Sequence, residues 1–175
     1  MSRQRAPRPW SCAWKWFVAL ALGIVGAAAA APHPLLGQPA PDFALQAVAG
    51  SNVRLAEHRG EVVVLSFWSS RCSTCGAQLA ALERSLKTYQ SAGLRVLGIN
   101  VGDETDRAIE AARSHDVSFP LLLDTRKEVS RQYRIDNLPM TVLIDRDGRV
   151  RHVHRDYSSR SEALYVQQLR ALLNE

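Results

Sequence analysis

Residues 62–75 read VVVLSFWSSRCSTC, a run of apolar residues followed by a Cys-x-x-Cys motif formed by Cys72 and Cys75. A nearly continuous apolar, β-branched run such as residues 62–68 is typical of a strand buried on both faces, as in a parallel sheet. Apolar residues then recur every three or four positions, which predicts an amphipathic helix. The residues with this spacing are Leu79, Leu82, Leu86 and Tyr89. The two cysteines are therefore expected where a buried strand gives way to a helix.

Strands and helices alternate along the remaining chain. Before the motif, Phe43-Ala44-Leu45 and Val53-Arg54-Leu55 flank a turn and predict a β-hairpin. After the motif, strands are expected at residues 94–101, 119–123, 140–144 and 150–154. Helices are expected at residues 103–116, 126–133 and 161–173. This order, which ends in a hairpin and a helix, predicts a three-layer α/β domain.

Two of these helices carry recognisable signals. Asp103 and Asp106 have the spacing of an acidic capping box, which predicts that they open the helix at residues 103–116. The last helix is identified by the apolar residues Leu164, Leu169 and Leu172.

The composition is that of a globular protein. The chain has 175 residues, 46% hydrophobic and 22% charged, which predicts one domain and excludes a collagen-like or disordered chain. Its net charge of +5 raises the question of nucleic-acid binding. Four basic residues and no acid lie within residues 1–15, and the rest of the chain has 18 basic and 17 acidic residues. A nearly neutral domain gives no reason to expect nucleic acid as a partner.

Residues 1–30 have the features of a signal peptide or of a single N-terminal membrane anchor. A basic segment precedes an apolar run from Trp16 to Ala31, and Ala28-x-Ala30 fits the rule for cleavage. The run has 16 residues, fewer than the roughly 20 that a spanning helix needs, and both alternatives stay open. Either predicts a periplasmic protein, with a proline-rich, extended lead-in at residues 31–41 and one domain at residues 42–175.

The only cysteines of the predicted domain are those of the motif, which favours redox chemistry. A thiolate at a helix N-terminus is stabilised by free backbone N–H groups and by the helix dipole, and Arg71 would add to this if it faced the sulfur. We assign Cys72, at the exposed start of the helix, as the attacking nucleophile. Cys75, one turn further along, is then the resolving thiol.

Two other interpretations of the motif are weaker. A structural disulfide across two residues closes too short a loop to stabilise the fold much. A zinc site needs four ligands, so His152 and His154 would have to complete it. Their spacing in a strand favours a solvated face instead. No metal and no other cofactor is therefore expected.

Four segments of the chain resemble those of one known family. They are Gly37–Leu45, Phe67–Cys75, Phe119–Asp124 and Asn137–Gly148. In this order and spacing they resemble the TlpA/ResA/DsbE-type thiol-disulfide oxidoreductases, which are extracytoplasmic proteins. The resemblance implies a thioredoxin-like three-layer α/β/α sandwich with a central mixed sheet, and a redox-active disulfide between Cys72 and Cys75.

The same resemblance implies further site residues. Pro139 is expected to be a cis-proline that faces the cysteines. The backbone of Leu138 is expected to pair with an extended substrate segment, which is recognition by strand addition. Trp68 is expected beside the disulfide, either as a core residue or as a substrate contact. Asn137 stands where the family commonly has Gly, and Asn tolerates a positive φ better than most residues.

Three residues near the cysteines depart from the family pattern. Arg71 replaces a Trp, Gln78 replaces a Glu thought to handle protons, and Ser66 replaces the Asp that thioredoxins bury. We expect Arg71 and Gln78 to modulate the cysteine pair. Without those acids, water, Glu57 or Asp103 would have to accept the proton of Cys75.

The resemblance implies a reductase of disulfides in client proteins, of the kind needed for cytochrome c or copper-site maturation, with a membrane thiol-disulfide electron donor. Three alternatives stay open: a disulfide-forming oxidase, a thiol peroxidase, and a copper- or partner-binding module without turnover. The chain lacks the inserted helical domain of DsbA-type oxidases. It also has Leu65 where the peroxidase pattern Pro-x-x-x-Thr-x-x-Cys has its proline.

Overall fold

The structure, a computed structural model, describes residues 32–175 apart from the side chain of Ser159. Its centre is a five-stranded sheet with the order β5-β4-β3-β6-β7. These strands are β3 (Val62–Trp68), β4 (Leu94–Val101), β5 (Leu121–Asp124), β6 (Met140–Ile144) and β7 (Val150–His154). β3, β4 and β5 are parallel, whereas β6 is antiparallel to β3 and β7 is antiparallel to β6. The sheet is therefore mixed, with β3 at its centre.

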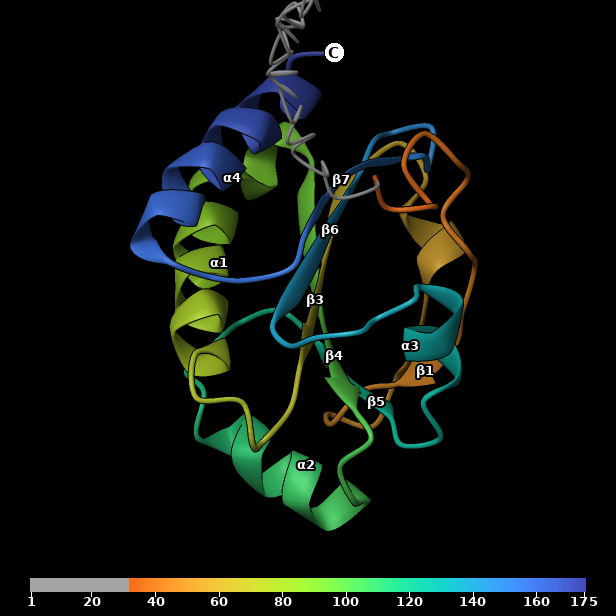
Figure 1. Ribbon diagram of the computed structural model, residues 1–175, viewed down its shortest axis with the longest axis vertical. Helices are drawn as coiled ribbons and strands as arrows, with labels where there is room; N and C mark the ends of the chain where they lie inside the picture. Colours follow the sequence, from red (N-terminus) through yellow and green to blue (C-terminus); the bar gives the residue numbers. More distant parts are fainter. Residues whose placement is uncertain (1–31) are drawn as a thin grey trace, which may run out of the picture. The chain divides into compact units, whose positions relative to one another are not determined.

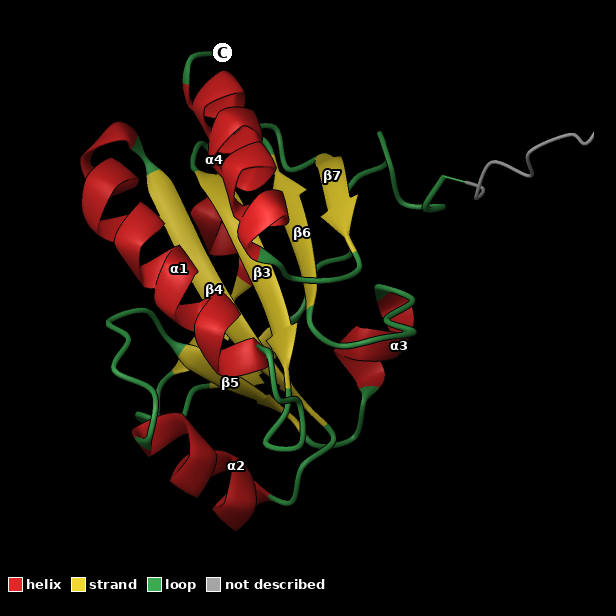
Figure 2. Ribbon diagram, turned by 60° about the vertical axis from the view of Figure 1, so that its left-hand side comes forward, coloured by secondary structure: helices red, strands yellow, loops and turns green. Residues whose placement is uncertain are grey.

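Helices cover both faces of this sheet. Figure 1 shows α1 (Cys75–Tyr89) and α4 (Ser159–Leu173) on one face and α3 (Glu128–Gln132) on the other. The hairpin of β1 (Ala44–Gln46) and β2 (Asn52–Arg54) lies on the α3 side, where Figure 1 labels β1. α2 (Thr105–Arg113) lies beyond one end of the sheet (Figure 2). Two 3-10 helices complete the fold, η1 (Leu55–His58) and η2 (Gln90–Ala92). This is the expected three-layer α/β/α architecture.

All seven residues of β3 are buried, because its side chains alternate between two hydrophobic cores. Odd-numbered residues such as Phe67 pack under α3 and the hairpin. Even-numbered apolar residues such as Trp68 pack under α1 and α4. Burying an aliphatic or aromatic side chain contributes about 1.5–3 kcal/mol. The strand that leads to the Cys-x-x-Cys motif is therefore held in place from both faces.

The predicted strands agree with the observed ones to within two residues, but the helices differ more. α2 begins at Thr105, and Asp103 does not cap it, because the Asp103 carboxylate accepts hydrogen bonds from Ser70 and Asn100 instead. In α4, Leu164 is 45% exposed, whereas Tyr165 is 4% exposed and takes the buried position. Both differences arise from contacts with distant parts of the chain.

The predicted lead-in is not extended throughout. Residues 34–37 form turns. The N–H of Gly37 donates to the carbonyl of Val150 at 2.7 Å, and the N–H of Val150 donates to the carbonyl of Gln38 at 2.9 Å. These hydrogen bonds hold the lead-in against the start of β7.

The predicted leader at residues 1–30, with its Cys12, lies outside the described residues, as does Ala31. Within residues 32–175, every helix is too short or too polar to cross a membrane.

Candidate active site

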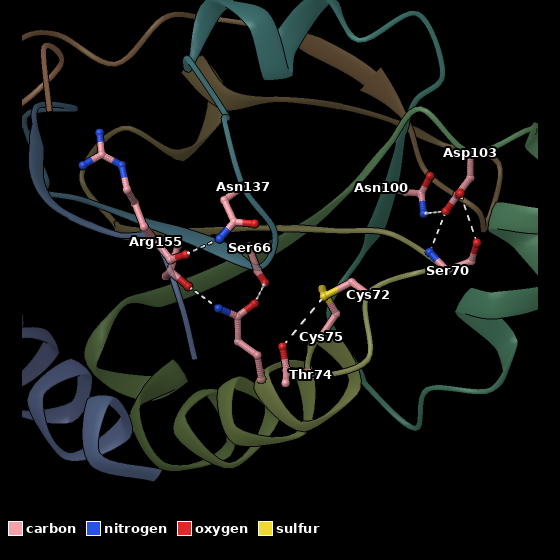
Figure 3. The surroundings of a disulfide bond; sticks show 11 residues. Ser66, Ser70, Cys72, Thr74, Cys75, Asn100, Asp103, Asn137 and Arg155 are labelled. Atoms are coloured by element: carbon pink, nitrogen blue, oxygen red, sulfur yellow. Dashed lines mark hydrogen bonds between the residues drawn. A yellow bond between two sulfur atoms is a disulfide. The ribbon is translucent and has the colours of Figure 1, made fainter. Parts of the chain in front are cut away.

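A disulfide joins Cys72 and Cys75 where β3 is followed by α1 (Figure 3). Cys72 lies in the turn after β3 and is half-buried, whereas Cys75 is the first residue of α1 and is 1% exposed. Their Cα atoms lie 5.4 Å apart. Within residues 32–175, the hydrogen-bond contact made by a cysteine sulfur joins Cys72 Sγ to Thr74 Oγ1, at 3.9 Å. Cys72 is therefore the more accessible of the two sulfurs.

The turn that carries Cys72 is tied to the end of β4 by the carboxylate of Asp103 (Figure 3). This side chain, 1% exposed, accepts hydrogen bonds from the backbone N–H of Ser70 at 2.7 Å and from the Ser70 hydroxyl at 3.0 Å. Asn100, in β4, donates another at 2.8 Å. Burial alone would raise the pKa of Asp103, but these donors, together with Arg71, hold the pKa below its ordinary value. Asp103 is a charged anchor for the turn.

Glu57 and Asp103 are the acids that the sequence suggests for accepting the proton of Cys75. Glu57 is exposed in η1, and both carboxylate oxygens of Asp103 already accept hydrogen bonds from Ser70 or Asn100. In the described part of the chain, neither carboxylate makes a hydrogen bond to a cysteine sulfur in this oxidised state.

The peptide bond between Leu138 and Pro139 is cis, as the family resemblance implies. Pro139 is buried and leads directly into β6, whose residue Met140 is the register partner of Phe67 in β3. Leu138 is half-buried and lines a groove together with Cys72. The end of β3 and the start of β6 therefore bring the disulfide and the cis peptide bond to the same edge of the sheet.

Asn137 does not adopt the positive φ that its place in the family pattern suggests. Among the described residues other than Gly, the two with positive φ are Lys127 and Arg134. The side chain of Asn137 instead donates to the backbone carbonyl of Arg155, at 3.5 Å (Figure 3). This contact links the segment before the cis peptide bond to the segment after β7.

Trp68 packs behind the disulfide, with 0% of its surface exposed, in the same core as Cys75. Of the two roles that the sequence leaves open, its position is that of a core residue. Sequence reasoning missed its neighbour His115, whose ring meets the indole edge-on with centroids 5.4 Å apart. Burial lowers the pKa of His115, which favours the neutral imidazole. No sequence signal marks this histidine, because it follows α2 and reaches Trp68 only through the fold.

Three neutral polar side chains form a buried chain between α1 and the sheet. Ser66, in β3, donates to Gln78 Oε1 at 2.8 Å, and Gln78 Nε2 donates to Thr141 Oγ1, in β6, at 2.6 Å. All three residues are 0% exposed. A buried polar group must be hydrogen-bonded to be tolerated, and here each is. Gln78 therefore joins α1 to two strands through groups that do not ionise near neutral pH.

His152 and His154 do not form the solvated strand face that their spacing suggests. Both are half-buried, because α4 lies across this part of β7. His154 packs against Tyr165 with ring centroids 4.1 Å apart, and its Nε2 makes a hydrogen bond with Gln168 at 2.7 Å. Burial lowers the pKa of both histidines. In residues 32–175, no group of three or more His, Cys, Asp or Glu side chains is arranged to hold a metal ion.

Comparisons with known proteins agree with this geometry. The AhpC/TSA family matches residues 36–153. The thiol-disulfide oxidoreductase ResA of Geobacillus thermodenitrificans is 32% identical over 118 residues, which cover 67% of this chain and 68% of that protein. ResA of Bacillus subtilis is 32% identical over 114 residues, or 65% of this chain and 64% of that protein.

A solved structure of a thiol:disulfide interchange protein is also similar to this chain. A thiol:disulfide interchange protein of the DsbE type from Chlorobium tepidum superposes with a TM-score of 0.76 at 30% identity. The superposition covers 79% of this chain and 97% of that one. The comparisons confirm the thioredoxin-like fold and the resemblance from which it was predicted.

We expect Asp103→Asn to lower the free energy of unfolding at pH 7 by about 2 kcal/mol, because the charged acceptor of the Ser70 and Asn100 hydrogen bonds is lost. The lowered pKa of Asp103 means that its charge stabilises the fold at neutral pH, and that this stabilisation is lost as the pH falls through the lowered pKa. The variant should therefore lose less stability than the wild type below about pH 4. Urea unfolding at neutral and acidic pH measures both effects.

Asp116→Asn is the matched control, because Asp116 is exposed in the loop after α2. It should change stability by less than about 0.5 kcal/mol. If Asp103→Asn were as stable as this control at pH 7, the anchoring role of Asp103 would be wrong.

Proposed function

The chain belongs to the AhpC/TSA family and is a thiol-disulfide oxidoreductase, and we propose that it reduces disulfides of client proteins outside the cytoplasm. The observation that carries the proposal is the accessible sulfur of Cys72, which shares a groove with Leu138 at the cis peptide bond. A client segment lying along the backbone of Leu138 as an added strand would bring its own cysteine to Cys72.

The reduced pair is the reactive form in this reaction. The Cys72 thiolate attacks one sulfur of a client disulfide and releases the other client sulfur, which takes a proton. Cys75 then loses its proton and attacks the Cys72 sulfur, which frees the second client thiol. The client gains two electrons and two protons, and the protein is left with the Cys72–Cys75 disulfide seen in the structure. A dithiol donor at the membrane must then reduce this disulfide.

The start of α1 favours Cys72 as the attacking group. The first turn of α1 holds no acidic residue, and its N–H groups and dipole favour a negative charge there. The Thr74 hydroxyl, 3.9 Å from Cys72 Sγ, is close enough to donate to a thiolate after a small movement. Arg71 stabilises a Cys72 thiolate less than its charge suggests, because its Nε lies 3.8 Å from Asp103 and 73% of its side chain is exposed.

The proton of Cys75 needs an acceptor, and the Ser66–Gln78–Thr141 chain has no group that ionises near neutral pH. Two acceptors remain in the proposed reaction: the departing client thiolate and water that reaches the half-buried Cys72. Proton transfer from Cys75 to the client sulfur would couple the attack of Cys75 directly to the release of the client thiol.

The location and the clients are also proposals. The leader-like pattern of residues 1–30 and the family resemblance support a periplasmic domain, exported or anchored. Outside the cytoplasm, proteins that load haem or copper need reduced cysteines, and such proteins are the clients we propose.

The reduction potential of the Cys72–Cys75 pair tests the direction of the reaction. We expect a value below about −200 mV, between those of the glutaredoxins and thioredoxin, and reduction of insulin with dithiothreitol as the donor. A potential near about −120 mV, as in DsbA, would identify an oxidase and contradict the proposal. Rapid turnover of hydrogen peroxide without insulin reduction would identify a peroxidase.

Single cysteine variants test the order of attack. Cys72→Ser should abolish insulin reduction and form no mixed disulfide with a client peptide. Cys75→Ser should also lose turnover but should accumulate a mixed disulfide through Cys72, visible by mass spectrometry, because no resolving thiol is left. If Cys72→Ser keeps insulin reduction, the assignment of the nucleophile is wrong.

We expect Gln78→Glu to add a second ionisation to the pH profile of disulfide reduction. The new carboxyl group would lie in a site that is 0% exposed, and burial raises the pKa of a carboxyl group. The profile of kcat/KM against pH is therefore expected to gain an inflection above about pH 5 that the wild type lacks.

Gln167→Glu, on the exposed face of α4, makes the same chemical change away from the disulfide and should leave the profile unchanged. A wild-type inflection identical to that of Gln78→Glu would show that another group already supplies the proton transfer.

A further inference from the structure

The groove next to the disulfide has an apolar floor and a basic rim. It has a volume of about 450 Å³ and lies between the turn before α1, α3 and the segment that precedes the cis peptide bond. Val101, Ile135 and Leu138 contribute its apolar surface, and Cys72 opens into it. The cations that line it are Arg71, Lys127 and Arg131, all of them exposed.

Arg71 approaches the carboxylate of Asp103 at 3.8 Å, but the other two cations of the rim are not paired with an acid in the described part of the chain. In residues 32–175, neither Lys127 nor Arg131 has a carboxylate within 4.0 Å, and a guanidinium nitrogen of Arg131 donates to a backbone carbonyl. The acid that lines the groove, Asp136, is paired with Arg155 at 3.5 Å. The groove therefore presents a net positive charge beside the sulfur that reacts.

The backbone of Lys127 adopts an unusual conformation. Its φ is 57°, in the left-handed region, which costs a residue with a side chain roughly 1 kcal/mol or more. Its side chain lies over Gly102, where a Cβ would clash with Lys127 Cε. Gly102 itself has a φ of 68°, so glycine is favoured there for two reasons.

The segment around Lys127 is held in place by hydrogen bonds to Asp124, at the end of β5. The carboxylate of Asp124, 2% exposed, accepts hydrogen bonds from the N–H groups of Val129 at 3.2 Å and Ser130 at 2.7 Å. The N–H of Lys127 donates to the carbonyl of Asp124 at 3.0 Å. These contacts fix the backbone at the start of α3, which supplies Lys127 and Arg131 to the rim.

We propose that the groove selects client segments in which an acidic residue lies two positions from the reactive cysteine. Alternate residues of an extended strand share a face, so this residue points to the same side as the cysteine that meets Cys72. Its carboxylate would meet Lys127 and Arg131, and apolar neighbours would cover Ile135 and Leu138. The inference rests on the proposed function and names the class of client that the site accepts, an acidic peptide.

Three otherwise identical peptides test the inference, each with one intramolecular disulfide and with Glu, Gln or Lys two positions from a cysteine. The full-length protein should reduce the Glu peptide with a kcat/KM about threefold to tenfold above that of the Lys peptide, the range expected for two exposed charge pairs. This preference should shrink at about 0.5 M salt, because exposed charges are screened. It should fall to near unity in Lys127→Gln/Arg131→Gln.

Arg160→Gln is the matched control, because it removes an exposed cation from α4, on the other face of the sheet. This variant should keep the preference of the wild type. Circular dichroism and Tm check that the double variant is folded. If it is not, the salt dependence of the wild-type preference still decides the question.

Each remaining outcome separates the two proposals. If the wild type reduces the Glu and Lys peptides equally well, the groove does not select by charge and this inference is wrong, while the reductase function stands. If the wild type reduces neither the peptides nor insulin, the proposed function itself is wrong. If vesicles of anionic phospholipid bind the wild type but not the double variant, and no peptide preference exists, the basic rim contacts a membrane surface and the inference is also wrong.

Discussion

Asp103 places a carboxylate that is 1% exposed at the end of β4, where it accepts hydrogen bonds from the turn after β3. β3 and β4 are parallel, and Trp68 is the register partner of Asn100, so both strands end at the same edge of the sheet. A buried charge is tolerated only while it is hydrogen-bonded. If Ser70 moved away, the buried Asp103 carboxylate would lose two of its hydrogen bonds and the fold would be destabilised. Cys72 lies only two residues after Ser70. The position of Cys72 therefore depends on a contact between the segments that follow these two strands.

The two sides of the disulfide differ in charge because different elements supply them. On the side of α1, the neighbours are the buried Trp68 and the neutral Ser66–Gln78–Thr141 chain. On the side of the groove, the neighbours are basic side chains from the turn and from α3. A neutral, buried surrounding disfavours an ionised sulfur, whereas a positive, hydrated one favours it. This asymmetry supports the proposed order of reaction, in which Cys72 attacks and Cys75 resolves the mixed disulfide.

The parts of the fold that the sequence predicts are those with local causes. The apolar run of β3 and the helical spacing after it place the Cys-x-x-Cys motif correctly, and Pro139 follows from the family pattern. Asp103 shows where local reasoning fails, because its spacing to Asp106 imitates a capping box while its real partner, Ser70, lies 33 residues away. The prediction that His154 lies on a solvated face is wrong for the same reason. Its strand is predicted, but the packing of α4 over it is a tertiary contact. Lys127 carries no signal at all, since a left-handed lysine is uncommon.

Redox chemistry and client choice are built on different elements, so either can change without the other. The Ser66–Gln78–Thr141 chain involves β3, α1 and β6, whereas Lys127 and Arg131 belong to the segment around α3. Arg71 is the exception to this separation, because it lies in the turn before Cys72, approaches Asp103 and also lines the groove. A substitution at Arg71 therefore changes the anchor of the turn and the charge of the groove together. Its effects on potential and on client preference cannot be separated, whereas those of Lys127 and Arg131 can.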